Sequence, residues 1–271
     1  MSIAVILLLV TLGVDGVSSL SAAARTDGIE MAAMQAIAKS TGADRSLGWG
    51  VKSADPCDGT WPGVRCDKDS HVVAINASRA GLSGTLSGTD LVDLGYLTEL
   101  DLNFNRLGDD MPILPRPLTY LTTLNLQSNS FMGMPETFFR SFPALETVVL
   151  DDNWVIMGEL LGQQPRNDLK SGLPSSFAKN SKIKFLDISR QQYSIGLGMY
   201  NGFLDFVAGM TSLVEIHVAG DQFRGPLPDV SGLLNLKVFD AADNNLCGKL
   251  KFPPGVAVNV TGNPQIGKDC P

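Results

Sequence analysis

The side chains best suited to chemistry in this 271-residue sequence are carboxylates that stand beside short aliphatic runs. They are Glu99, Asp101, Asp151, Asp187, Glu215 and Asp240. A hydrolase that uses two carboxyl groups needs one on each side of a pocket. Here the acids belong to separate aliphatic runs, apart from Glu99 and Asp101, so the sequence indicates an open charged surface and not a carboxylate active site.

Other catalytic or metal-binding arrangements find little support. One of the two histidines, His217, has Glu215 and Ala219 as its alternating neighbours and no Ser or Cys nucleophile beside it. The four cysteines are too widely spaced for zinc and lack histidine support. No loop has the ligand spacing of a calcium site. We therefore expect no catalytic activity, no metal and no cofactor.

The aliphatic runs that carry these acids follow one pattern. Leu97–Leu107 fits L-x-x-L-x-L-x-x-N-x-L, the pattern of a leucine-rich repeat. The same grid, with degraded spelling in places, begins again at Val72, Leu121, Leu145, Ile183, Leu213 and Leu236. Seven tandem repeats within residues 71–250 predict a solenoid in which each repeat adds one short strand to a parallel sheet.

The predicted fold class is an α/β leucine-rich-repeat solenoid. Its curved parallel sheet forms the concave side, and Gly-Pro segments such as Gly225–Pro228 predict a convex side that is mostly 3₁₀ or extended. The repeat asparagine should turn inward and bond to the backbone of neighbouring coils. Ala80, Gln191 and Asp221 stand in its place, which predicts less regular first, fifth and sixth coils.

Alternation along each strand assigns a set of polar residues to the concave face. In these positions there are six carboxylates and no Lys or Arg, so we expect the face to attract a basic protein or peptide. The alternative is that a chain of net charge −7 simply has acidic faces. The predicted ligand-binding residues are Glu99, Asp101, Asn103, Asn125, Gln127, Asp151, Asp187, Glu215, His217 and Asp240.

The two ends of the chain indicate export from the cell. Residues 1–24 read as a signal peptide, although an uncleaved anchor is the alternative, and no later stretch is apolar enough to span a membrane. Residues 25–70 form a predicted N-terminal cap that begins with a helix, and residues 251–271 a C-terminal cap. The pairs Cys57/Cys66 and Cys247/Cys270 suit disulfides, which predicts an extracellular or plasma-membrane-surface location. Acidic charge argues against nucleic-acid binding.

Two further features bear on partners. Irregular insertions near 156–180 and 194–209 are long enough to be functional loops, or they reflect decay of the array.

Asn76-Ala77-Ser78 and Asn259-Val260-Thr261 are glycosylation sequons. A glycan on Asn76 would hinder a partner at the first coil.

Four further motifs stand outside the repeat pattern or extend it: Asp55-Pro56-Cys57 with Trp61-x-Gly63-Val64-x-Cys66, Met210–Leu213, Asp221–Asp229 and Gly262–Asp269. In these motifs the sequence resembles the extracellular part of the transmembrane-kinase (TMK) subfamily of plant leucine-rich-repeat receptor kinases. The resemblance implies auxin or growth signalling, with an auxin-binding protein or a full-length receptor kinase as partner. The family's non-repeat island is missing, and neither a span nor a kinase follows Pro271, so phosphorylation does not carry over.

These observations favour a secreted or cell-surface recognition module that binds a peptide or protein ligand on its acidic concave face, in auxin/growth or defence signalling. The alternative is an apoplastic inhibitor of pathogen wall-degrading hydrolases. A degenerate fragment without a partner is a third hypothesis, and reductant-sensitive cooperative melting would count against it.

Overall fold

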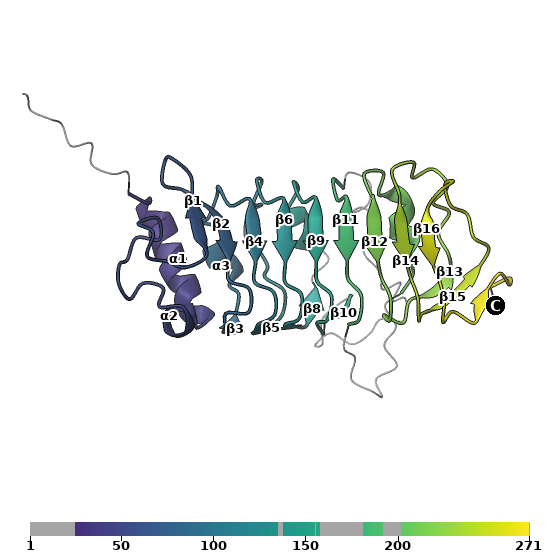
Figure 1. Ribbon diagram of the computed structural model, residues 1–271, viewed down its shortest axis with the longest axis horizontal. Helices are drawn as coiled ribbons and strands as arrows, with labels where there is room; N and C mark the ends of the chain where they lie inside the picture. The colour runs from purple at the N-terminus through teal and green to yellow at the C-terminus, as the bar shows by residue number, and fades with distance from the viewer. Residues whose placement is uncertain (1–24, 135–137, 155, 158–180, 192–201, 271) are drawn as a thin grey trace, which may run out of the picture.

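The computed structural model describes residues 25–134, 138–154, 156–157, 181–191 and 202–270. Within these ranges, nine strands lie side by side along the long axis of the molecule (Figure 1). In sheet order they are β1 (Val64–Cys66), β2 (Val72–Asn76), β4 (Glu99–Asp101), β6 (Thr123–Asn125), β9 (Thr147–Val149), β11 (Phe185–Asp187), β12 (Glu215–His217), β14 (Val238–Asp240) and β16 (Ala257–Asn259). All neighbours pair in parallel except β1 and β2, which are antiparallel. The predicted parallel solenoid is confirmed.

The aliphatic grid explains the register of this sheet. The central residue of each strand points inward and stacks on the central residue of the next strand, because side chains alternate between the two faces. The stacked row is Ile75, Leu100, Leu124, Val148, Leu186, Ile216, Phe239 and Val258. All but Val258 are almost completely buried in one core that runs the length of the rod.

The opposite side of the coils is built from short extended and 3₁₀ segments, as predicted. One small sheet contains β3 (Ser83–Thr85), β5 (Arg106–Asp109) and β7 (Ser130–Phe131); a second contains β8 (Gly133–Met134) and β10 (Ile156–Met157); a third contains β13 (Arg224–Pro226), β15 (Asn245–Gly248) and β17 (Gln265–Ile266). The helical pieces are η1 (Phe138–Ser141), η2 (Asp205–Gly209) and the single turn α3 (Gly88–Leu91).

Helices α1 (Gly28–Ser40) and α2 (Ala43–Ser46) close the first coil (Figure 1). Asp27 caps α1 by accepting the Ile29 N–H. Gly84 in β3 lets the end of α1 approach closely, since its φ is +117° and a Cβ there would lie 2.2 Å from the Ser40 carbonyl oxygen. The cap therefore packs directly on the solenoid.

The predicted disulfides are present at both ends. Cys57 bonds to Cys66 beside the buried pair Trp49 and Trp61, whose rings are 5.5 Å apart. Cys247 bonds to Cys270, which ties the C-terminal tail to β15. Both ends of the core are thus covered by covalently closed segments.

The repeat asparagines form the expected ladder between coils. Asn129, for example, donates its amide hydrogens to the carbonyls of Leu102, Leu126 and Gln127, while its Oδ1 accepts the Leu107 N–H. The members that share this arrangement are Asn105, Asn129, Asn153, Asn244 and Asn263. Buried backbone groups of adjacent coils are satisfied in this way.

Gln191 corrects one expectation from the sequence. Its amide donates to Leu150 O, Ile188 O and Ser189 O, the same three carbonyl positions that an asparagine reaches. The extra methylene is accommodated within the buried coil, so the substitution of Gln for Asn does not break the ladder.

The predicted signal peptide (1–24), most of the insertion predicted near 156–180 (158–180) and the first half of the insertion predicted near 194–209 (194–201) lie outside the described residues. Among the residues that are described, no helix has both the length and the apolar character needed to cross a bilayer.

Candidate functional site

The outward side chains of the sheet form columns that run along the rod, and we call their combined surface the sheet face. The second column takes one residue from each strand between β2 and β16. Its members are Asn76, Asp101, Asn125, Val149, Asp187, His217, Asp240 and Asn259. The first column consists of the residues two positions before the second column along each strand, and it contains Glu99 and Glu215. The third column consists of the residues two positions after the second, and it contains Asn103, Gln127 and Asp151.

The acids and amides of the second column share one structural task. In each, Oδ1 accepts the backbone N–H of the residue two positions later, which fixes the turn at the end of the strand. Asp101, Asp187 and Asp240 make this bond at 3.1, 3.0 and 3.2 Å. Asn76, Asn125 and Asn259 make it at 3.3, 3.2 and 3.3 Å. Where the turn has a side-chain oxygen acceptor, that acceptor therefore does not need a negative charge.

The acids near the N-terminal end are partly shielded. Burial raises the pKa of Asp101, the neighbouring Glu99 raises it further, and the Asn103 N–H lowers it. Glu99 itself pairs with Arg65 of β1 at 3.4 Å. Both side chains of this pair are well exposed, so water screens the interaction.

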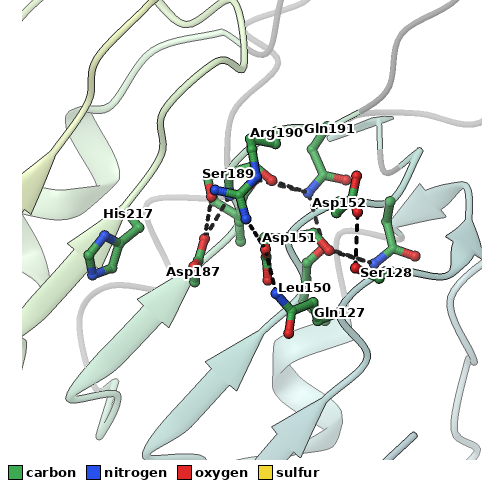
Figure 2. A network of polar contacts seen from close by, with 12 residues as sticks. Gln127, Ser128, Leu150, Asp151, Asp152, Asp187, Ser189, Arg190, Gln191 and His217 are labelled. Carbon is green, nitrogen blue, oxygen red and sulfur yellow. Dashed lines mark hydrogen bonds and ion pairs between the residues drawn. The ribbon is translucent and has the colours of Figure 1, made fainter. Parts of the chain in front are cut away.

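The middle of the sheet face carries a denser polar network (Figure 2). Asp151 is completely buried, and its Oδ2 accepts hydrogen bonds from Arg190 at 2.5 Å and from Gln127 at 2.9 Å. Burial raises the pKa of Asp151, and the charge of Asp187 raises it further, whereas Gln127 and Arg190 lower it. The carboxylate is thus held within the coil and covered by a cation.

The backbone conformation of its coil determines where Arg190 lies. The residue before the ladder side chain is left-handed in this coil and in others, with φ of +54° at Arg190 and +50° at Ser128. This conformation places Arg190 between the strand and the inward-pointing Gln191. The Arg190 side chain can then reach back across the sheet face to the preceding coil.

His217 lies among the acids of the C-terminal half. In the sheet register it stands between Asp187 of β11 and Asp240 of β14. Its ring nitrogens lie 3.8 Å from Glu215 Oε2 and 4.0 Å from Asp240 Oδ2, and its ring is 5.5 Å from that of Phe185. Within the described ranges, no three acid, histidine or cysteine side chains are grouped as a metal site.

Nine of the ten predicted binding residues lie half-buried on the sheet face, and Asp151 is buried beneath it. Sequence reasoning missed Arg65 and Arg190, which place two positive charges beside this face. Arg65 comes from the antiparallel strand β1, and Arg190 from the left-handed position that follows the third column. An apolar-polar alternation identifies neither position as part of the face.

Both sequon asparagines belong to the second column. Asn76 occupies its first strand, β2, and Asn259 its last, β16, and both side chains are exposed. Glycans on these residues would flank the strands between β4 and β14.

Comparisons with known proteins agree with this architecture. Residues 30–67 match the model of the leucine-rich-repeat N-terminal domain. The receptor-like kinase TMK2 of Arabidopsis thaliana is 31% identical over 233 residues, which cover 72% of this chain and 26% of TMK2. This chain is a leucine-rich-repeat protein that is similar over most of its length to a part of that receptor-like kinase. It spans about a quarter of the length of that relative.

Solved structures show the same fold. The PEPR1–AtPEP1 structure superposes with a TM-score of 0.69 at 23% identity, over 88% of this chain and 32% of that one. The leucine-rich-repeat ectodomain of the Arabidopsis thaliana receptor kinase GASSHO1/SCHENGEN3, solved in complex with CASPARIAN STRIP INTEGRITY FACTOR 2, gives a TM-score of 0.58 at 20% identity, over 88% and 30%. The chain therefore has the fold of a plant receptor-kinase ectodomain.

Proposed function

We propose that this protein is a non-catalytic recognition module, outside the cell or at the plasma-membrane surface, that binds a basic peptide or protein segment on its sheet face. The proposed contact surface lies between β4 and β14, where a partner would meet the second-column acids together with Glu99, Glu215 and His217. A role in auxin/growth or defence signalling, with an auxin-binding protein or a receptor kinase as partner, is part of the same proposal.

One observation carries this proposal. Asp101, Asp187 and Asp240 perform a backbone task that Asn76, Asn125 and Asn259 perform equally well without charge. The three negative charges are therefore not required by the fold. Negative charge on an open face attracts cationic partners and speeds their association.

Three further points support it. The Arg190 guanidinium already forms an ion pair with the Asp151 carboxylate, so a group of this size and charge fits among these acids (Figure 2). A solenoid that is rigid along its core offers a surface that needs little reorganisation on binding. The GASSHO1/SCHENGEN3 ectodomain, which has this fold, was solved in complex with CASPARIAN STRIP INTEGRITY FACTOR 2.

The test neutralises the charges and keeps the turns. The variant Asp101→Asn/Asp187→Asn/Asp240→Asn should melt as the wild type does, because Asn preserves each Oδ1 acceptor. A biotinylated arginine-rich peptide should associate with it more slowly, and with a weaker dependence on salt, in surface-plasmon-resonance measurements.

The matched control is Asp109→Asn/Asp205→Asn/Asp269→Asn, which removes the same charge from exposed sites on β5, η2 and the C-terminal tail. It should associate with the peptide as the wild type does. Equal slowing in both triple variants would show that only net charge matters, and the proposed face would be rejected. Capture from plant cell-wall fluid with wild-type and face-neutralised bait then identifies the natural partner.

A further inference from the structure

Asp221 stands in the ladder where the other coils with a polar ladder residue have an amide. The amide side chain has two tasks there, as Asn244 in the next coil shows. Its Oδ1 accepts the N–H groups of Asp221 and Phe223 at 3.2 and 2.9 Å. Its Nδ2 donates to the carbonyls of Val218, Ala241 and Ala242 at 2.7, 3.1 and 3.0 Å.

Asp221 clearly performs the first of these tasks. Its side chain is completely buried, and Oδ1 accepts the Gln191 N–H at 2.9 Å. The second task needs a hydrogen-bond donor, which an ionised carboxylate does not have and a protonated one does. By the spacing of the other ladder residues, the carbonyls that face this position are those of Ile188, Val218 and Ala219.

We propose that Asp221 is held as a neutral carboxylic acid whose O–H takes the place of the ladder amide. The packing of the β11 coil on the β12 coil, which we call the joint, then depends on the protonation of Asp221. A carboxylate facing backbone carbonyls in a dry core would repel them, whereas the protonated acid bonds to one of them.

Burial and the nearby carboxylates together favour the neutral form of Asp221. Burial is the main cause that raises its pKa, to about 8, and Asp187 of β11 and Asp151 of the β9 coil raise it further. The Gln191 N–H and Arg190 act in the opposite direction. On the other side, the β14 coil presents the neutral amide of Asn244.

The direction of the pH effect follows from these values. Asp221 has an ordinary pKa of 3.8 and a folded pKa of about 8, so folding takes up a proton between these limits. The joint is most stable below the ordinary pKa and weakens as the pH rises toward the folded one. Arg190 and Gln191 belong to this joint, so acidification should also hold the centre of the sheet face more firmly.

The test uses the residue that the ladder normally employs. Asp221→Asn supplies the donor without a proton equilibrium, so its melting temperature should exceed that of the wild type by several degrees at about pH 9, and the two should converge only below about pH 4. Asn244→Asp is the matched converse and should acquire the pH dependence that Asp221→Asn loses. Infrared difference spectra of the wild type between about pH 6 and pH 9 should show loss of a protonated-carboxyl band that Asp221→Asn lacks.

Parallel melting curves for wild type and Asp221→Asn across this range would overturn the proposal. So would an infrared spectrum without the protonated-carboxyl band at about pH 6, a measurement that needs only the wild-type protein.

Discussion

Arg190, almost two-thirds exposed, places its guanidinium on the fully buried carboxylate of Asp151 in the preceding coil. The pair joins the surface of the β11 coil to the interior of the β9 coil, and Gln127 adds a third coil to the same oxygen (Figure 2). Three coils are therefore linked through one atom at the middle of the sheet face.

Without Arg190, the buried carboxylate of Asp151 should destabilise the fold. Arg190→Gln is expected to lower the free energy of unfolding by about 1–3 kcal/mol, because Asp151 loses its charged donor. Adding Asp151→Asn should restore part of that loss, and urea unfolding of the full cycle measures the coupling. The control is Arg65→Gln, whose ion pair with Glu99 is exposed at both ends and should matter less. No coupling between Arg190 and Asp151 would contradict this account.

The ladder residues should be far more sensitive than the face residues. Asn153→Ala removes the amide nitrogen that donates to three buried carbonyls and the oxygen that accepts the Phe131 N–H, so we expect a loss of about 2–4 kcal/mol in chemical denaturation. Asn125→Ala removes one turn bond at a half-buried site and should cost about 1 kcal/mol or less. Equal losses would mean that the ladder is not a main source of stability.

Each disulfide should stabilise the fold mainly by restricting the unfolded chain. Replacing both cysteines of Cys57–Cys66, or both of Cys247–Cys270, by serine is expected to cost about 3 kcal/mol. Thermal melting with and without reductant provides the measurement. Reductant should lower the melting temperature of the wild type further than that of either double variant. A wild type indifferent to reductant would argue against this role.

Both sequons are exposed and should accept glycans in a secretory host. Asn76→Gln and Asn259→Gln are each expected to remove one glycan mass, and treatment with an N-glycosidase should bring all forms to the polypeptide mass. Asn125→Gln, which alters the same column without a sequon, should keep the full glycan mass. Unchanged glycan mass in Asn76→Gln or Asn259→Gln would show that the altered site is unoccupied.

The spacing of aliphatic residues was enough to predict the seven repeat strands and the helical cap, and the two close cysteine pairs near the ends predicted both disulfides. It did not reveal β16, because Gly255 and Gln265 replace the outer leucines of the pattern there. The signal that remained was Val258 and Val260 followed by the ladder residue Asn263, whose amide bonds to Ala241 O. A search that weights the inner positions and the asparagine above the outer leucines would find this strand.

The candidate face was predictable in outline but not in its charge. Alternation placed Asp151 outside, whereas its side chain is completely buried, with Arg190 and Gln127 bonded to its Oδ2. The cation that covers Asp151 comes from a left-handed residue in another coil, at a separation that no local pattern encodes. The role of Gln191 depended on side-chain reach within a three-dimensional coil, which residue type alone does not give.

The nine-stranded sheet ends differently at its two borders. At one border β1 runs against β2 and is followed by the helical cap, whereas no described strand pairs with the outer border of β16. Backbone groups on such a border can template the addition of a strand from a second molecule, which is a common route to fibrous polymers. A bulky carbohydrate on Asn259, inside β16, would obstruct that addition, so a modification that would limit access to the face would also keep these rods from joining end to end.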